Sequence, residues 1–503
     1  MIRHSGRLLT GLLAALLLWA PLPFGSVTPW AAASLQILSF AALALAAFTD
    51  SPRAVRPALP LAAAVSAVAL FGVAQSLPWP ARLVSLLSPG HADLVARAAA
   101  LPGAAAGQPH LSLAPAGSRA AALLWAAAAA ALLAGAMAGR RRENRRWLAG
   151  SVLAGGLFQA FFGAREQLRR SPTLWGVEAP ISPRLHGTFV NPNHAALYLE
   201  LGLAIAFAWG WWALRRARSE PLFERRLLLV AGPLLAWLTL LAGLLLSGSR
   251  GGLLAALVGM TAQGMLAAGV RRRWRSALLG LGVGVTGLVV VVLGIGLQAG
   301  LGRLVDTHGG DAGGQARLTE YAAVLRLWRR FPFFGAGLGS FSEAFPPVQP
   351  ADLQGTWWHA HSDILELIAT TGVVGVLLLA AGVAALSRRL FAVLRGYGRS
   401  EDRAGALAAL GILAVLTVHE MLDFGLTMPA NALTVAVLAG AVATVEAKRA
   451  RTASAQPDRA RHDPAAGDAL DLQDVGSRTE RSVGGQGSGR LSRHQSAEHS
   501  VQP

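Results

Sequence analysis

Apolar runs close to the length of a membrane-crossing helix recur along almost the whole chain. They lie near residues 8–26, 30–48, 59–77, 120–138, 147–163, 194–212, 227–246, 252–269, 276–299, 364–386, 404–421 and 430–446. A helix needs roughly 20 apolar residues to cross a bilayer. The runs are blocks of Leu, Ala, Val and Gly without the period-2 alternation of a membrane barrel. The sequence therefore predicts an all-α fold, a polytopic transmembrane bundle of about twelve helices.

The composition agrees with this fold class. Hydrophobic residues make up 53% of the 503 residues and charged residues only 14%, whereas a soluble domain carries roughly 25% charged residues. The chain has no cysteine. Disulfides, thiolate metal sites and cysteine nucleophiles are therefore excluded.

The formal net charge of +18 raises the possibility of nucleic-acid binding, but the distribution of the arginines argues against it. They gather in short connections between apolar runs, as the positive-inside rule expects of cytoplasmic loops. If the N-terminus is cytoplasmic and the runs alternate, every dense cluster falls on that side. The clusters are Arg53/Arg56, Arg140–Arg146, Arg215–Arg226, Arg271–Arg275, Arg388–Arg403 and Lys448–Arg451. Both termini are then cytoplasmic, and the long connections 78–119, 164–193 and 300–363 face outward.

The two ends of the chain have distinct compositions. Arg3 to Arg7, followed by the apolar stretch from Leu8 to Ala20, is similar to a signal peptide, but with so many runs following we expect an uncleaved first helix. Residues 451–503 are rich in Ser, Gly, Arg, Asp and Gln, which predicts a disordered cytoplasmic tail after a transmembrane domain of residues 1–450. No internal repeat indicates an inverted-repeat transporter.

Polar residues near membrane spans are costly and are therefore functional candidates. Arg184, Asn191 and Asn193 lie in a turn-rich approach to the run at 194–212, on the side away from the basic clusters. Either asparagine is equally compatible with a role as a helix N-cap. Arg250 lies in the short hairpin 247–252, where backbone amides beside a guanidinium suit a phosphate. A snorkelling arginine at a helix end is the alternative.

The large outer connection and the mouths of the last spans hold further candidates. Arg317 begins an amphipathic stretch through Arg330 and is a second candidate anion binder; the alternative is an ion pair with Glu320 or Asp311. The glycines of 335–339 indicate a turn packed on aromatic residues.

His359, His361 and Asp363 precede the run at 364–386. They lack a clear third zinc ligand, whereas a histidine at a water–membrane boundary can act as a general base. His419 and Glu420 lack the second histidine of a zincin motif. Glu420 and Asp423 are candidates to hold an arginine or a histidine in place.

Together these segments resemble the O-antigen ligase and O-antigen polymerase superfamily of membrane glycosyltransferases. The resemblance covers roughly residues 60–435, with the motifs in order. It is carried by Gly187-Thr188-Phe189 with Asn191 and Asn193, Ser249-Arg250-Gly251, Arg317 ahead of Trp328 and Pro332, Gly335 and Gly337, and His361-Ser362-Asp363 followed by Leu365 and Gly372. Ser362 stands where many members have asparagine.

The resemblance implies a GT-C-like bundle with a large periplasmic loop between helices nine and ten, here 300–363. It also implies inverting, metal-independent and cofactor-free glycosyl transfer at the periplasmic face of the bacterial inner membrane. The donor would be a glycan on undecaprenyl pyrophosphate, and the acceptor a hydroxyl of lipid A–core, of another glycan or of a protein. By motif, Arg250 and Arg317 would neutralise the pyrophosphate and His361 would act as the base. Arg184, Asn191, Asn193, His359, Asp363, His419 and Asp423 are the predicted substrate-binding residues.

Two groups of alternatives remain open from sequence. A ligase, a polymerase and a protein O-oligosaccharyltransferase differ in their acceptor, which these motifs do not separate. A membrane transporter is an alternative of another class, favoured by membrane-embedded acids and broken helices. The fixed arginines and the self-activated pyrophosphate of the expected donor favour glycosyl transfer.

Overall fold

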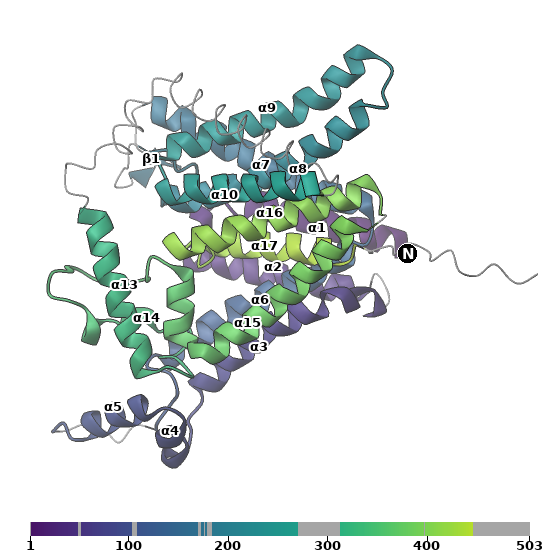
Figure 1. The fold of residues 1–503 in the computed structure, drawn as a ribbon. Coiled ribbons are helices and arrows are strands. Elements are labelled where there is room, and N and C mark those ends of the chain that lie inside the picture. Colours follow the sequence, from purple (N-terminus) through teal and green to yellow (C-terminus); the bar gives the residue numbers. More distant parts are fainter. Residues whose placement is uncertain are drawn as a thin grey trace, which may run out of the picture. The chain divides into compact units, whose positions relative to one another are not determined.

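The computed structural model describes residues 2–48, 52–102, 108–169, 173–175, 177–178, 184–269, 312–396 and 398–445. Every predicted apolar run except 276–299, which lies outside the described residues, coincides with a helix. These helices are α1 (Ile2–Trp19), α2 (Pro29–Ala47), α3 (Leu59–Ser76), α6 (Pro115–Ala138), α7 (Arg142–Leu168), α8 (Pro192–Ala217), α9 (Phe223–Ser247), α10 (Arg250–Gly269), α15 (Asp363–Arg395), α16 (Ser400–Leu422) and α17 (Pro429–Ala443). The predicted all-α polytopic fold is confirmed (Figure 1).

Nine helices of the described part are long and apolar enough to cross a membrane, whereas α1 and α17 are shorter apolar helices. The strands there are two residues each, β1 (Thr173–Leu174) paired antiparallel with β2 (Val177–Glu178). All described residues belong to one compact unit, residues 1–450; the predicted tail 451–503 lies outside them.

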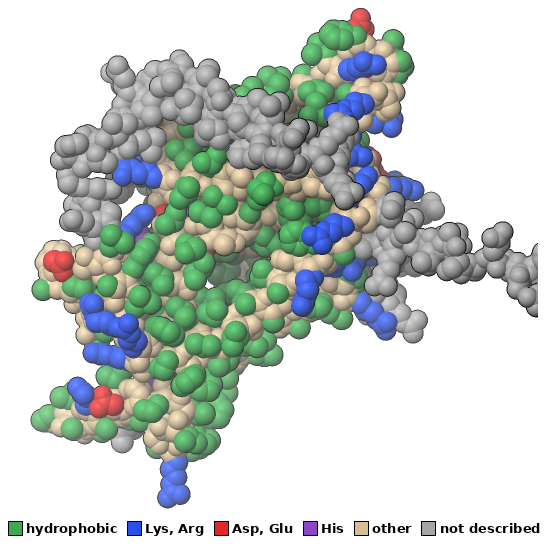
Figure 2. Space-filling view, in the orientation of Figure 1, with side chains coloured by type: hydrophobic (Ala, Val, Ile, Leu, Met, Phe, Trp, Pro, Cys, Tyr) green, Lys and Arg blue, Asp and Glu red, His purple; other side chains and the backbone are tan. Residues whose placement is uncertain are grey.

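The helices of the bundle pack through small residues and present large apolar side chains outward. α6 packs on α17 so closely that a Cβ at Gly440 would collide with the backbone oxygen of Leu132. Leu70, Leu228 and Leu377 are 69%, 73% and 62% exposed, and hydrophobic side chains cover the visible sides of the helices in Figure 2. Small residues at helix interfaces and apolar residues facing outward are what a bilayer solvent favours.

Hydrogen bonds join the helix ends that the alternating topology assigns to one side. Arg142 and Arg145, at the start of α7, both bind Asp402 in the first turn of α16, with nitrogen–oxygen distances of 3.1 and 2.6 Å. Arg389, near the end of α15, donates to the backbone oxygen of Val445, just after α17, at 2.8 Å. The start of α7, the start of α16 and the ends of α15 and α17 therefore lie at one end of the bundle.

Helix α15 is broken at Gly372, whose φ of 63° and ψ of −167° are not helical. The segment 332–338 packs into the break: the amides of Val373 and Val374 donate to the backbone oxygens of Pro332 and Phe333 at 3.0 and 3.2 Å. A Cβ at Gly372 would collide with that backbone, so glycine is needed both for its conformation and for the close approach.

Gln75 of α3 completes this junction from inside the bundle. Its fully buried side chain donates to the backbone oxygens of Phe334 (2.6 Å) and Thr370 (3.1 Å), and accepts from the amide of Leu338 (2.9 Å). One side chain thereby binds backbone groups of both the broken helix and the segment that fills the break, and the Thr370 oxygen also accepts from the amide of Gly337 at 2.9 Å.

Residues 312–361, which we call the cap, pack around a small apolar core of their own. The predicted amphipathic stretch is confirmed as α13 (Ala312–Arg330), followed by α14 (Phe341–Ala344) and the 3-10 turn η3 (Pro346–Val348). Buried residues include Leu327, Phe331 and Phe345. In the preceding connection 78–119, α4 (Ala81–Leu87) and α5 (Pro89–Ala99) form, and Leu94 of α5 packs on this core.

Candidate active site

Asp423, the residue after α16, joins three elements of the chain. Its side chain is 6% exposed. Oδ2 accepts hydrogen bonds from Nδ2 of Asn193 on α8 and from Nη2 of Arg317 on α13, the latter at 3.4 Å. Oδ1 accepts from the amide of Phe424 at 2.9 Å. The expectation that Asp423 holds an arginine is confirmed, and the ion-pair partner of Arg317 is Asp423 rather than Glu320. Asp311, the other alternative, lies outside the described residues.

Arg184 extends this network toward the hairpin between α9 and α10. Its Nη2 donates to Oδ1 of Asn193 at 2.8 Å and its Nε donates to the backbone oxygen of Ser247 at 2.6 Å. Ser247 ends α9, and Gly248 turns the chain with a φ of 58°. Arg250, exposed, then begins α10. The structure therefore places Arg184, Asn193, Arg317 and Asp423 in one chain of contacts, with Arg250 three residues beyond the carbonyl that Arg184 binds.

Asn191 has the local role that the sequence left open. Its Oδ1 accepts from the amide of Asn193 at 2.8 Å, so it is the N-cap of α8. Capping fixes the first turn of the helix. Asn193, with both ends of its amide bonded to charged side chains, is thereby held in the network.

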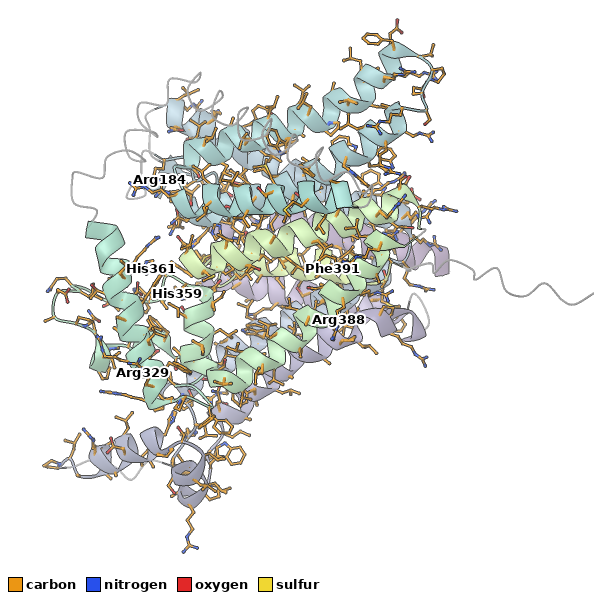
Figure 3. The ribbon with its side chains drawn as sticks, in the orientation of Figure 1. Arg184, Arg329, His359, His361, Arg388 and Phe391 are labelled. Atoms are coloured by element: carbon orange, nitrogen blue, oxygen red, sulfur yellow. The ribbon has the colours of Figure 1, made fainter. Side chains whose placement is uncertain are left out.

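His361 lies against α13 through both its ring and its backbone. Nδ1 is 3.1 Å from Oε2 and 3.4 Å from Oε1 of Glu320. The hydroxyl of Tyr321 donates to the backbone oxygen of His361 at 2.9 Å. The rings of Trp357 and Phe424 pack edge-on against the imidazole, each with its centroid 5.1 Å away. Figure 3 shows His359, His361 and Arg184 toward one end of the bundle, with Arg388 and Phe391 toward the other.

Burial and local charge shift the titration of the groups around His361. Burial raises the pKa of Glu320, although the hydrogen bond and charge of His361 and the charge of Arg317 act in the opposite direction. Burial also raises the pKa of Tyr321 to about 12, so its hydroxyl stays protonated and can donate.

His359 stacks on Phe424 with a centroid distance of 4.8 Å and its Nδ1 is 3.2 Å from the carboxylate of Glu366. Burial alone lowers the pKa of His359, but the hydrogen bond and charge of Glu366, with the charge of Asp363, raise it to a net value above the usual one. The pairing with Glu366 therefore favours the protonated ring.

Asp363 and Ser362 connect the start of α15 to the turn after α16. Asp363 accepts from the amides of Leu426 and Thr427 at 2.7 and 3.1 Å, and from the Thr427 hydroxyl. Ser362 caps α15 by accepting from the amide of Leu365 and donates to the backbone oxygen of Glu420 at 3.0 Å. Both side chains are used in holding the frame around His361.

His419 lies inside the bundle rather than at its mouth. It is 1% exposed, and its Nδ1 is 3.0 Å from Oε1 of the fully buried Glu200 on α8. The pair links α8, which carries Asn193, to α16, which ends directly before Asp423. This location favours a positioning role for His419 over direct contact with substrate.

Sequence patterns did not single out Gln75, Glu200 or Glu366, and assigned Glu320 only as a partner for Arg317. Glu200 had a local signal, since an acid within an apolar run needs a partner. The other contacts depend on chain segments brought together by folding. No group of three or more His, Asp and Glu side chains among the described residues has the arrangement of a metal site.

Residues 234–380 match the family model described as O-antigen ligase. The resemblance to the O-antigen ligase superfamily is confirmed. The matched segment contains Arg250, Arg317, Glu320 and His361, whereas Arg184, Asn193 and Asp423 lie outside it. Among curated proteins none matches the chain. The match and the apolar helices support ligase-like glycan transfer in general by a multi-pass membrane protein.

Proposed function

We propose that this O-antigen ligase-like protein transfers a glycan from undecaprenyl pyrophosphate to an acceptor hydroxyl at the periplasmic face of the inner membrane. The observation that carries the proposal is the chain of contacts from Arg184 through Asn193 and Asp423 to Arg317, beside His361. It lies at the helix ends opposite to those joined by Arg142, Arg145 and Asp402, since Asp402 is in the first turn of α16 and Asp423 directly follows its last residue. Fixed cations and a histidine at one water–membrane boundary are the groups such a reaction requires.

On the donor side, Arg184, Arg250 and Arg317 are the proposed ligands of the pyrophosphate. Guanidinium groups bind phosphate oxygens in a bidentate manner and hold their charge at any physiological pH. The Arg317 side chain is 38% exposed while its partner Asp423 is 6% exposed. A substrate can therefore reach the guanidinium of Arg317, while the buried Asp423 restrains this guanidinium from the bundle side. Arg250 adds its charge at the N-terminus of α10, where helix amides favour anions.

On the acceptor side, His361 is the proposed general base. Its side chain is 30% exposed. The acceptor oxygen attacks the anomeric carbon, the bond from that carbon to the pyrophosphate oxygen breaks with its electron pair, and the acceptor proton moves to the imidazole. A single displacement of this kind inverts the anomeric centre. A positioned base supplies typically 10²–10⁴-fold in rate, and the arginines stabilise the leaving charge.

The membrane placement follows from the same arrangement. With the arginine-rich ends cytoplasmic, both termini of the transmembrane domain 1–450 are cytoplasmic and the cap is periplasmic. The exposed apolar sides of the helices give the polyprenyl tail an apolar surface to lie on. A reporter fused after Trp274 is then expected in the cytoplasm and one in the 340s in the periplasm.

A transporter is the second candidate, because the break at Gly372 and the buried Glu200–His419 pair are features of that class. In this chain, however, the break is filled by the cap segment 332–338 and by Gln75. The buried pair links two packed helices. These contacts favour a fixed scaffold for the outer site.

The test is a reconstitution with defined substrates. Purified protein in lipid nanodiscs is incubated with a glycan on undecaprenyl pyrophosphate and with lipid A–core, a second lipid-linked glycan, or a Ser/Thr peptide, and products are identified by mass. Transfer to lipid A–core without added metal is expected. Transfer to either other acceptor identifies a polymerase or a protein O-oligosaccharyltransferase. No transfer to any acceptor, together with uptake of the lipid-linked glycan by the same protein in sealed proteoliposomes, would overturn the proposal in favour of a transporter.

A further inference from the structure

We infer that Glu320 is the positioning residue that fixes the tautomer of His361 and so makes Nε2 the proton-accepting atom. This inference rests on the proposed function, because it assigns a partner to the proposed base. Neither the motifs of the resemblance nor the predicted site residues include Glu320.

The carboxylate of Glu320 faces one nitrogen of the His361 ring. The Glu320 side chain is fully buried, and both of its oxygens face Nδ1 of His361, at 3.1 and 3.4 Å. Nε2 is on the opposite edge of a ring whose side chain is 30% exposed. The Nδ1 edge is therefore committed to α13, and the remaining nitrogen is left for the substrate.

Hydrogen-bond chemistry decides which nitrogen of the neutral His361 ring carries the proton. A carboxylate only accepts, so a neutral imidazole beside it carries its proton on Nδ1. The lone pair of Nε2 is then available to take the acceptor proton. The imidazolium formed in that step is stabilised by the carboxylate that held the ring, the arrangement by which a histidine base is oriented in acyl-transfer enzymes.

Helix α13 holds His361 at two points, through its ring and through its backbone. Tyr321, next to Glu320, binds the backbone oxygen of His361 at 2.9 Å, and His361 has a φ of +44°, which is uncommon for a residue with a side chain. Trp357 and Phe424 confine the ring from the sides. Such over-determined geometry is typical of functional residues.

Other charged groups also face the pair. Arg317 lies one turn before Glu320 on α13, Glu366 approaches Glu320 from α15, and His194 approaches His361 from α8. Glu320 is the one in hydrogen-bond contact with the His361 ring within the described residues. A test must therefore separate loss of this contact from a general change in charge.

Glu320→Gln is the informative variant because an amide is close in size but can donate to Nδ1, which moves the ring proton to Nε2. We expect kcat to fall by about 10²-fold or more while KM for the donor changes little. Glu320→Asp should recover part of the rate. Glu343→Gln, on the exposed side of the cap, is the matched control and should behave as wild type.

The double variant His361→Ala/Glu320→Gln completes the design. If Glu320 acts through His361, the double variant is no slower than His361→Ala alone. If His361→Ala is slowed but Glu320→Gln keeps the wild-type rate, or if the two losses multiply in the double variant, the inference is wrong and the proposed function stands. If His361→Ala itself transfers glycan at the wild-type rate, the proposed base is wrong and this inference fails with it. Elution of each variant as a folded, monodisperse protein confirms that rates are compared between folded forms.

Discussion

Arg317 and Asp423 form an ion pair between the cap and the bundle, with Nη2 and Oδ2 3.4 Å apart across 106 positions of sequence. Asp423 also binds Asn193, which binds Arg184. One buried carboxylate therefore restrains two of the three arginines of the outer site, Arg317 directly and Arg184 through the amide of Asn193. The arrangement predicts that the charge of Asp423 is needed for donor recognition although Asp423 itself binds no phosphate.

Asp423→Asn should keep the size of the side chain but remove the charge that restrains Arg317. We expect kcat/KM for the lipid-linked donor to fall at least tenfold, equivalent to about 1.4 kcal/mol, because the guanidinium is no longer held for the pyrophosphate. Steady-state transfer kinetics measure the change. Asp352→Asn, an exposed acid of the cap, is the control. Unchanged donor kinetics in the Asp423 variant would show that the ion pair has no part in catalysis.

Arg317→Lys tests whether the planar guanidinium matters beyond its charge. Lysine cannot make the bidentate contact with a phosphate, so we expect roughly a tenfold or greater loss in kcat/KM for the donor. Arg329→Lys makes the same change on an exposed position of the same helix and should leave transfer unchanged. Equal effects of the two substitutions would indicate that only the total charge of the cap matters.

Gln75→Leu should destabilise the junction at the break in α15. The change leaves the oxygen of Phe334 and the amide of Leu338 without the side chain that binds them, whereas the Thr370 oxygen still accepts from the amide of Gly337. Each unsatisfied buried group costs about 1–3 kcal/mol. A lower midpoint of thermal unfolding in detergent is expected. Leu70→Ala, on the exposed side of the same helix, should have a much smaller effect. A Gln75→Leu midpoint equal to that of wild type would contradict the role given to Gln75.

Protonation of His91 should weaken the contact between α5 and the cap at low pH. Burial lowers the pKa of His91 to about 4 from the usual 6.5, and the ring packs on Phe331 with a centroid distance of 4.5 Å. Because undocked His91 binds a proton more readily, the contact is at full strength above pH 6.5 and weakens as the pH falls toward 4. Hydrogen exchange of residues 81–99, corrected for intrinsic rates, should increase between pH 7 and pH 5.

The His91→Phe variant supplies the control for this pH effect. It retains an aromatic contact but cannot take up a proton, so its protection should be independent of pH over the same range. Equal protection of wild-type α5 at pH 7 and pH 5 would rule out His91 as the cause of any loosening.

The sequence predicted most of the bundle because each span is a local property of about 20 residues. It also separated the arginines of the inner connections from Arg184, Arg250 and Arg317. The break at Gly372 was not predictable, because glycines within apolar runs are common. This break depends on the segment 332–338, which precedes α15 in the chain and fills the gap in the helix.

Contacts of the site between neighbouring residues could be predicted, whereas contacts between distant segments could not. The N-cap role of Asn191 depends on residues two positions apart and was among the interpretations that the sequence allowed. The choice of Asp423 over Glu320 as the partner of Arg317 depends on how α13 packs against the turn after α16. Glu320 then becomes available to His361, which no spacing within the sequence indicates.

The most direct test of the central claim is single-turnover transfer by the purified protein in nanodiscs, with saturating glycan on undecaprenyl pyrophosphate and the acceptor identified by reconstitution. We expect product formation by wild type, a rate at least about 10²-fold lower for His361→Ala, and an unchanged rate for His110→Ala, a histidine outside the site. Transfer by His361→Ala at the wild-type rate would contradict the role of His361 as the base.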